Sequence, residues 1–204
     1  MPNEAVAVFS AWADAGRGEP MGRSHARRAT AALEALGVQP GDRVLDLGCG
    51  EGWATRWLAG RAAAVVGLDG SEAMLARARR TPTPARYVSG DLLELPFPDG
   101  AFDRAFSMET LYYVDIDAAL AELARVLRPG GRAMVCADFY EEHAASHSWP
   151  EELGLVMDLR SQSGWEEALQ AAGFVDVSAR RLPDPTDPDH PGTLAVSGML
   201  PMHC

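Results

Sequence analysis

The fold can be inferred from one stretch, Val44-Leu45-Asp46-Leu47-Gly48-Cys49-Gly50-Glu51-Gly52. A short apolar run with a single acid is followed by three glycines at alternate positions, and a helical pattern begins directly after them. Glycines allow a backbone to come close to a ligand, and the start of a helix offers unpaired N–H donors. The stretch therefore predicts a buried strand that ends in a ligand-binding turn.

Strand and helix patterns alternate on the C-terminal side of this stretch. The predicted strands cover residues 43–47, 63–68, 86–89, 102–107 and 132–139, and the predicted helices cover residues 53–58, 71–80 and 117–127. This alternation is typical of strand and crossover-helix units, which place helices on both faces of a parallel sheet. We therefore predict an α/β fold with a doubly wound, Rossmann-like sheet.

The two ends of the chain flank this alternation. Residues 1–37 predict a short helix, a turn rich in glycine and an amphipathic helix that ends at Gly37. Beyond residue 139, a region without a clear period (140–163) precedes a helix at 165–172 and strands at 175–179 and 193–199. We find no internal repeat and predict one hydrophobic core.

Composition excludes several classes of function. The 204 residues have a formal net charge of −11, which argues against a nucleic-acid partner. All 18 basic residues are arginines, so no lysine is available for Schiff-base chemistry. The three cysteines are scattered, and we see neither a signal peptide nor a membrane-spanning run. We expect a cytoplasmic protein with no membrane partner; the oligomeric state is left open.

Acidic residues follow three successive predicted strands. Asp46 lies at the end of the first strand, Asp69 at the end of the second, and Asp91 follows the third. The distance in sequence from the glycines to Asp69 is close to the roughly 20 residues expected for an acid that binds ribose hydroxyls. In a dinucleotide fingerprint the third glycine would stand at Trp53, and Asp46 would repel a pyrophosphate. A cationic ligand, such as one carrying an ammonium group, suits these acids better.

Residues 44–52 are similar to the first motif of class I S-adenosylmethionine-dependent methyltransferases. Residues 95–103 resemble the P-F-x-D-x-x-F-D stretch of the small-molecule branch of that family, and residues 127–131 resemble the L-[KR]-P-G-G turn of the same branch. This branch resembles the ubiquinone and menaquinone methyltransferases. The resemblance extends from about residue 37 to residue 199. It implies a seven-stranded, mostly parallel sheet with the last strand antiparallel, and S-adenosylmethionine as the cofactor.

The resemblance also implies a domain division and a set of cofactor-binding residues. Residues 1–37 are expected to form an N-terminal helical lid, and residues 38–204 the methyltransferase domain that binds S-adenosylmethionine. The expected cofactor contacts are Trp12, Asp46, Gly48, Cys49, Gly50, Asp69, Gly70, Met74, Asp91, Leu92, Ser107 and Tyr112.

Methyl transfer is an in-line displacement, so the enzyme mainly has to hold the acceptor atom close to the methyl group. The predicted walls of the acceptor space are Trp12, Arg17, Met21 and His25 from the lid, and Glu109, Tyr112, Tyr113, Phe139, Tyr140, His143 and His147 from the strand ends. Among these, the predicted catalytic residues are His143, His147 and Tyr113, because a neutral imidazole can accept a proton near pH 7. His143 and His147 are spaced to share one helix face, where a metal site is a weaker alternative.

The main prediction is a methyltransferase that acts on a small-molecule substrate. The alternatives are a NAD-dependent oxidoreductase on a similar sheet, and a non-catalytic cofactor-binding protein of the same fold. The segment from Ser107 to Tyr113 departs from the histidine-rich version that is commoner in the family. Because that segment should line the acceptor space, the identity of the acceptor stays open.

Overall fold

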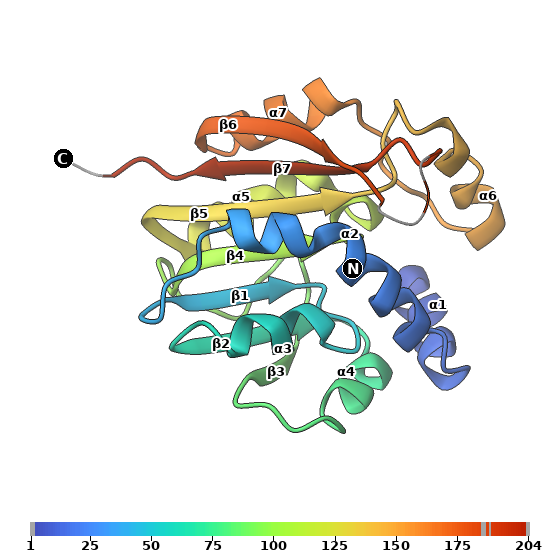
Figure 1. The fold of residues 1–204 in the computed structure, drawn as a ribbon, viewed down its shortest axis with the longest axis horizontal. Helices are drawn as coiled ribbons and strands as arrows, with labels where there is room; N and C mark the ends of the chain where they lie inside the picture. The colour runs from blue at the N-terminus through green and yellow to red at the C-terminus, as the bar shows by residue number, and fades with distance from the viewer. Residues whose placement is uncertain (1–2, 185–186, 188, 203–204) are drawn as a thin grey trace.

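The computed structural model describes residues 3–184, 187 and 189–202, and they form one seven-stranded sheet of order β3-β2-β1-β4-β5-β7-β6 (Figure 1). The strands are β1 (Arg43–Leu47), β2 (Ala64–Asp69), β3 (Arg86–Ser89), β4 (Phe102–Met108), β5 (Leu127–Ala137), β6 (Val175–Leu182) and β7 (Thr193–Met199). Pairing is parallel from β3 through β5, and β7 runs antiparallel to both β5 and β6. The predicted fold class is confirmed, including the antiparallel last strand.

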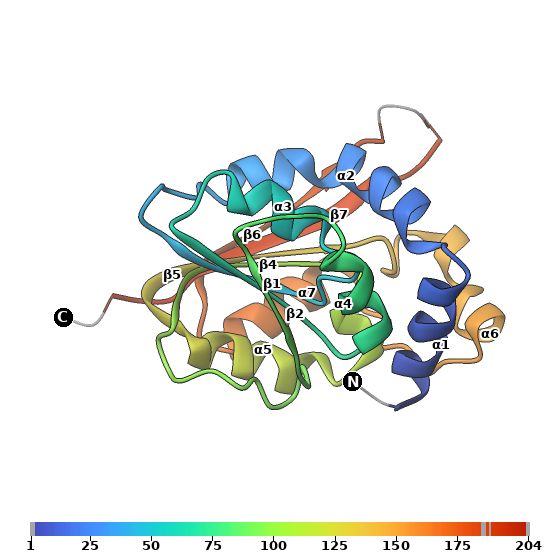
Figure 2. The same cartoon turned by 90° about the horizontal axis from the view of Figure 1, so that it is seen from below.

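Helices cover both faces of the sheet (Figure 2). They are α1 (Asn3–Asp14), α2 (Gly18–Ala35), α3 (Trp53–Ala59), α4 (Glu72–Ala78), α5 (Ile116–Val126), α6 (Trp149–Leu153) and α7 (Gln162–Ala171), with short 3-10 turns η1 (Leu111–Tyr113) and η2 (Ala144–Ser146). In Figure 2, α2 and α3 lie on one face and α5 and α7 on the other. None of the helices in the described part of the chain is long and apolar enough to cross a membrane.

Two hydrophobic clusters hold these layers together. Leu33 of α2 and Leu58 of α3 pack with Phe106 on one face of the sheet, whereas Ala105, the preceding residue of β4, packs on the other face with Leu120 of α5. Successive residues of a strand point to opposite faces, which is why one strand supplies both clusters. Each fully buried leucine of this kind contributes about 1.5–3 kcal/mol.

Several element boundaries differ from the sequence-based expectation. Helix α2 begins at Gly18, before Pro20, because the first turn of a helix tolerates a proline that lacks an N–H. Strand β5 begins at Leu127, which pairs with Phe102, so the turn expected at residues 127–131 lies within the strand. The region without a period, residues 140–163, contains η2 and α6.

The chain reverses its winding direction between β1 and β4, which are neighbours in the sheet. In open α/β sheets, ligands bind beyond the carboxyl ends of the strands at this switch point. Because β7 is antiparallel, it begins at the same edge, and its residue Leu194 is level with Ala137 at the end of β5. Residues from the last third of the sequence therefore reach the edge where the glycine-rich turn lies.

Candidate active site

The glycine-rich turn after β1 has left-handed backbone angles at three positions. The φ angles are +72° at Gly48, +52° at Gly50 and +78° at Gly52. A Cβ atom on Gly48 would lie 2.1 Å from Cγ2 of Thr110, whereas a Cβ atom on Gly50 would meet nothing within 4 Å. Gly48 is therefore required by close packing within the protein, and Gly50 faces open space that a ligand can enter.

Asp69, the last residue of β2, holds this turn in place. Its Oδ2 accepts a hydrogen bond from the N–H of Gly50 at 2.8 Å, and its Oδ1 accepts one from the N–H of Ser71, also at 2.8 Å. The side chain is buried, and burial raises its pKa. Each carboxylate oxygen retains one lone pair, and Asp69 lines the large cavity beside the turn. This position suits a carboxylate that binds ribose hydroxyl groups.

Asp46 lies elsewhere than the sequence argument placed it. Its Oδ2 accepts a hydrogen bond from Oγ1 of Thr55 on α3 at 2.5 Å, only 2% of the residue is exposed, and burial raises its pKa to about 7. Asp46 is not among the residues that line the cavity. The expected contact between this carboxylate and a cationic ligand is therefore not supported, and Asp46 instead joins β1 to α3 beneath the turn.

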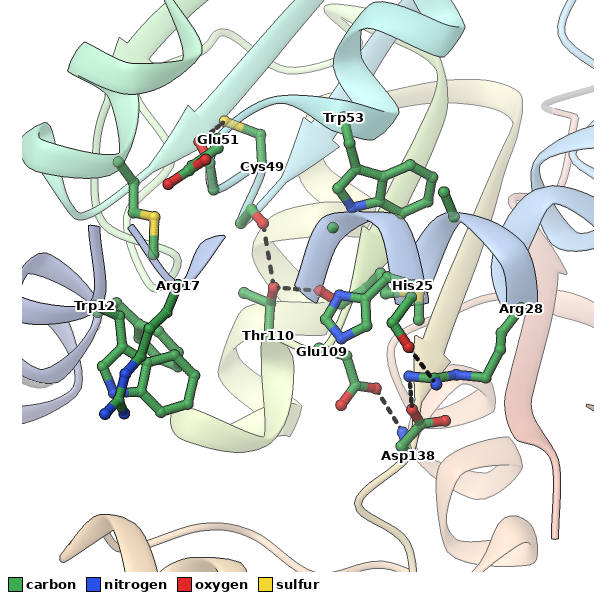
Figure 3. A pocket seen from close by; sticks show the side chains of 18 of the residues that line it. Trp12, Arg17, His25, Arg28, Cys49, Glu51, Trp53, Glu109, Thr110 and Asp138 are labelled. Carbon is green, nitrogen blue, oxygen red and sulfur yellow. Dashed lines mark hydrogen bonds and ion pairs between the residues drawn. The ribbon is translucent and has the colours of Figure 1, made fainter. Parts of the chain in front are cut away.

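The cavity has a volume of about 980 Å³ and lies between the carboxyl edge of the sheet and helices α1, α2 and α6 (Figure 3). We call the part near β1 and β2 the cofactor half; its residues are Gly48, Cys49, Gly50, Glu51, Asp69 and Met74. We call the part near the ends of β4 and β5 the acceptor half; its residues are Glu109, Tyr112, Asp138, His143, Trp149 and His190.

Seven of the predicted cofactor residues line the cavity: Trp12, Gly48, Cys49, Gly50, Asp69, Met74 and Tyr112. The other five, Asp46, Gly70, Asp91, Leu92 and Ser107, are not on its wall. Ser107 is fully buried and donates a hydrogen bond from Oγ to the carbonyl of Leu47 at 3.0 Å. It supports the sheet at the switch point, and Leu92 is part of the hydrophobic core.

A carboxylate of the cofactor half lacks a full set of partners. Glu51 lines the cavity, and its Oε1 is buried and accepts no hydrogen bond from the described residues, although Nε of Arg77 lies 3.7 Å away. A buried carboxylate oxygen is costly unless a donor or cation meets it. The pair of acids, Glu51 and Asp69, suits a ligand that carries hydroxyl groups and an ammonium, and disfavours a diphosphate.

His143 is positioned as a proton acceptor. Its Nδ1 lies 2.6 Å from the carbonyl oxygen of Asp138, so Nδ1 must carry the proton and Nε2 the lone pair. The residue lines the cavity, and burial lowers its pKa, which keeps the ring neutral at pH 7. Its ring lies 4.8 Å from that of His190, whose Nδ1 accepts the N–H of Gly192 and whose Nε2 is consequently a donor.

His147 does not join His143. It is exposed, its Nε2 lies 2.9 Å from the carbonyl oxygen of Glu141, and it is not a cavity residue. The two histidines flank the short η2 turn and do not share a helix face, so the spacing argument was wrong. Among the described residues no group of three or more His, Cys, Asp and Glu side chains could hold a metal ion.

Two tyrosines after β4, Tyr112 and Tyr113, line the cavity. Tyr112 donates a hydrogen bond from its hydroxyl to Oε2 of Glu109 at 2.6 Å. Tyr113 packs edge to face against Phe9 of α1, with ring centroids 5.0 Å apart. Tyr113 also lines the cavity, so it is an aromatic wall that the N-terminal helix covers. Arg17 and His25 line the cavity as well, and the side chain of Met21 lies outside the described residues.

Asp138, directly after β5, connects four segments of the site. Its N–H donates to Oε1 of Glu109 at 2.5 Å, and its carbonyl oxygen accepts from His143. Its carboxylate accepts from Nη2 of Arg28 on α2 at 2.7 Å and from Oγ1 of Thr193 on β7 at 2.6 Å. Sequence analysis missed Asp138, although it is one more acid at a strand end, the signal that pointed to Asp69.

Trp149 and His190 were missed for another reason. Trp149 begins α6 in the region without a period, and His190 lies in a loop rich in proline and aspartate that looks like a linker. Both reach the cavity only through long-range packing. Phe139 and Tyr140, which were predicted as walls, are fully buried and are not cavity residues.

A glycine turn and an acid at adjoining strand ends, at the switch point of a parallel sheet, define an α/β protein that binds a nucleoside. Comparison with known proteins identifies the family. Residues 45–135 match the family model described as "Methyltransferase domain". A demethylmenaquinone methyltransferase from Mycolicibacterium gilvum is 47% identical over an alignment that covers 76% of this chain and 77% of the relative.

Solved structures agree. A Haloferax volcanii structure titled as a complex of the Trm112 methyltransferase activator with a methyltransferase gives a TM-score of 0.88 at 35% identity, covering 95% of this chain and 97% of that chain. An S-adenosylmethionine-dependent methyltransferase from Mesorhizobium loti gives 0.69 at 30% identity, covering 84% and 97%. The chain belongs to the S-adenosylmethionine-dependent methyltransferases of class I. Its cofactor is S-adenosylmethionine, which excludes the NAD-dependent alternative.

Proposed function

We propose that this methyltransferase transfers the methyl group of S-adenosylmethionine to a small-molecule acceptor by in-line displacement. The observation that carries the proposal is the single cavity of about 980 Å³, in which the cofactor half continues into the acceptor half. Small-molecule sites span roughly 300–1,000 Å³, so the cavity has room for the cofactor and a second small molecule. The name of the Mycolicibacterium relative, a demethylmenaquinone methyltransferase, supports a small acceptor.

The cofactor half is proposed to hold S-adenosylmethionine through the residues on its wall. Gly48 and Gly50 allow close approach, Asp69 accepts hydrogen bonds from the ribose, and Cys49 and Met74 complete the wall of this half. Trp12 of α1 and Tyr112 of the acceptor half also line the cavity and are proposed as further cofactor contacts. When bound, S-adenosylmethionine supplies an electrophilic methyl group on a positively charged sulfur. Asp46 and Ser107 act beneath this surface, because they fix the strand ends that carry it.

His143 is the proposed general base of the acceptor half. Its Nε2 carries the lone pair, and the hydrogen bond to the Asp138 carbonyl fixes the ring orientation. Tyr113 is proposed as an aromatic wall beside the acceptor. Replacing His143 with Gln keeps a side chain that can bond to Asp138 but removes the base, so we expect kcat to fall by 10²-fold or more while the affinity for S-adenosylmethionine is unchanged.

Residues 1–37 are the proposed lid, and residues 38–204 the methyltransferase domain. Helices α1 and α2 both contribute to the cavity wall, through Phe9 and His25 among others. A Cβ atom on Gly22 of α2 would lie 3.3 Å from Cδ1 of Trp53, so α2 packs closely on the start of α3. A lid of this kind excludes water from the reacting groups.

The function is tested in two steps with the purified protein. Calorimetry with S-adenosylmethionine should show binding, and Asp69→Asn should weaken it at least tenfold, whereas the exposed control Asp99→Asn, at a side chain 81% exposed, should not. The protein is then incubated with radiolabelled S-adenosylmethionine and an extract of the source cells. Label in the low-molecular-mass fraction supports the proposal; label only in acid-precipitable protein or RNA overturns the small-molecule acceptor.

The Haloferax volcanii relative suggests a protein partner as well. That structure is titled as a complex with the Trm112 methyltransferase activator. We propose that an activator of this kind also binds the present chain. Size-exclusion chromatography of the chain with a Trm112 protein should give one shared peak, and separate elution of the two proteins would contradict the proposal.

A further inference from the structure

Glu109 is a half-buried carboxylate of the acceptor half. In the described part of the chain its two oxygens accept hydrogen bonds from neutral donors, the N–H of Asp138 at 2.5 Å and the hydroxyl of Tyr112 at 2.6 Å. Among the described residues, no arginine or histidine forms an ion pair with it. A carboxylate that is partly removed from water is stabilised by a cation beside it.

The neighbouring cation is neutralised by other acids. Arg28 is 2.7 Å from the carboxylate of Asp138 and 3.2 Å from that of Asp184. Burial lowers the pKa of His143 and lowers that of His25 to about 4, so neither ring adds positive charge near pH 7. Burial and the nearby Asp138 carboxylate raise the pKa of Glu109 well above its usual value, so a cation that binds beside Glu109 would favour its ionised form.

The backbone holds Glu109 in an unusual conformation. Its φ angle is +56°, which is uncommon for a residue with a side chain, and strained positions of this kind cluster at functional sites. Glu109 directly follows β4 at the switch point, and its side chain is directed toward Asp138 at the end of β5, away from the glycine-rich turn (Figure 3). The carboxylate thus belongs to the acceptor half and not to the cofactor half.

Aromatic rings surround the same space. Tyr112, Tyr113 and Trp149 line the cavity, and the ring of Trp149 lies 6.3 Å from that of His143. The faces of aromatic rings attract cations, and a carboxylate beside such rings is a common arrangement for binding an ammonium group. We propose that the acceptor half binds a cationic nitrogen compound, a primary or secondary amine on an aromatic or aliphatic frame, with Glu109 as its counter-ion.

This inference rests on the proposed methyltransferase function and names its acceptor class. In it, Glu109 holds the ammonium group, and Nε2 of His143 takes one proton from that group, which frees the nitrogen lone pair for methylation. The donor at Nε2 of His190 is available to a polar substituent on the acceptor. Glu109 makes contact with the substrate, so it is proposed as a specificity-determining residue.

The test compares probes that share a shape and differ in charge. Tyramine, phenethylamine and benzylamine are each measured by calorimetry against the corresponding alcohol, with the protein saturated with S-adenosylhomocysteine. We expect at least one amine to bind about tenfold more tightly than its alcohol. In Glu109→Gln the amide oxygen can still accept the N–H of Asp138, the amide NH2 can donate to the Tyr112 hydroxyl, and the charge is lost, so that preference should disappear. Glu109→Asp should restore part of it. Glu167→Gln, at an exposed position on α7, is the matched control and should keep it.

Three outcomes would overturn the inference. The first is that none of the amines binds more tightly than its alcohol. The second is that the preference persists in Glu109→Gln. The third is that Glu109→Gln weakens binding of S-adenosylmethionine but not of S-adenosylhomocysteine, because the charge would then serve the sulfonium of the cofactor. If the protein binds neither cofactor form, the proposed function itself fails, which separates the two failures.

Discussion

The guanidinium of Arg28 lies 2.7 Å from the carboxylate of Asp138, and this ion pair joins helix α2 to the carboxyl end of β5. The two side chains are only 12% and 3% exposed. Removing one partner of a buried pair leaves the other charge uncompensated, which costs about 3–5 kcal/mol. The pair therefore ties the N-terminal helices to the acceptor half.

Arg28→Met should lower the free energy of unfolding by about 3 kcal/mol, measured by urea denaturation. The double variant Arg28→Met with Asp138→Asn should recover part of that loss, since one of the two buried carboxylates that Arg28 meets is then neutral. The exposed Arg80→Met serves as the control and should change stability by less than about 0.5 kcal/mol. Equal losses in Arg28→Met and Arg80→Met would show that the pair does not stabilise the fold.

Asp46 should make the protein less stable as the pH rises. Its pKa is raised to about 7 in the folded protein, from 3.8, so the folded state holds its proton more tightly than the unfolded state does. This stabilising effect is complete below about pH 4, decreases between pH 4 and 7, and is absent above pH 7. Asp46→Asn should gain about 2–4 kcal/mol relative to the native protein at pH 8, and little at pH 4. Urea denaturation at both pH values measures the difference, and a gain that is the same at both would contradict the prediction.

His25 should act in the opposite direction. Burial lowers its pKa in the folded protein to about 4 from 6.5, so the unfolded state binds the proton more readily. Stability is therefore lost as the pH falls from about 6.5 to 4. His25→Gln should remove about 2 kcal/mol of that acid sensitivity, read from the difference in urea midpoint between pH 7 and pH 4.5. If His25→Gln loses as much stability between pH 7 and pH 4.5 as the native protein does, His25 is not the source of the acid sensitivity.

Gly48 and Gly50 should respond differently to alanine. In Gly48→Ala the new Cβ would lie 2.1 Å from Thr110, so we expect a loss of more than about 2 kcal/mol in stability. In Gly50→Ala the Cβ has open space, and only the φ of +52° is unfavourable, at about 1 kcal/mol. Gly50→Ala should therefore stay folded yet bind S-adenosylmethionine at least tenfold more weakly. Thermal unfolding and calorimetry on both variants distinguish the packing role of Gly48 from the ligand-access role of Gly50. Unchanged affinity for S-adenosylmethionine in Gly50→Ala would contradict the proposal that the cofactor approaches the backbone at Gly50.

Periodicity predicted the sheet and most helices because those patterns depend on neighbouring residues. Periodicity could not show that Asp69 lines the cavity whereas Asp46 lies beneath the turn. The register of the strands explains this difference. Asp46 is level with Gly67, two residues before Asp69, so its side chain points under α3 and not off the edge of the sheet. The sequence carries a signal of this difference, because Asp46 lies two residues before Gly48 whereas Asp69 directly precedes Gly70.

The acceptor half was harder to predict. Glu109, Asp138 and His143 meet because the ends of β4 and β5 lie side by side, and a motif read along the chain gives no distance between them. His190 reaches them from a loop that looks like a linker. The cofactor half, in contrast, comes mostly from consecutive residues, which is why it resembled a known family before the fold was available.

The place of β7 also has a consequence for how the protein is made. Strand β7 is synthesised after β5 and β6 and is inserted between them, and β6 has no partner in the described sheet until β7 arrives. A nascent chain that ends before residue 193 thus lacks Thr193, the partner of Asp138, and cannot complete its catalytic pocket. Methylation by this enzyme therefore requires that synthesis has passed β7, which ends at Met199.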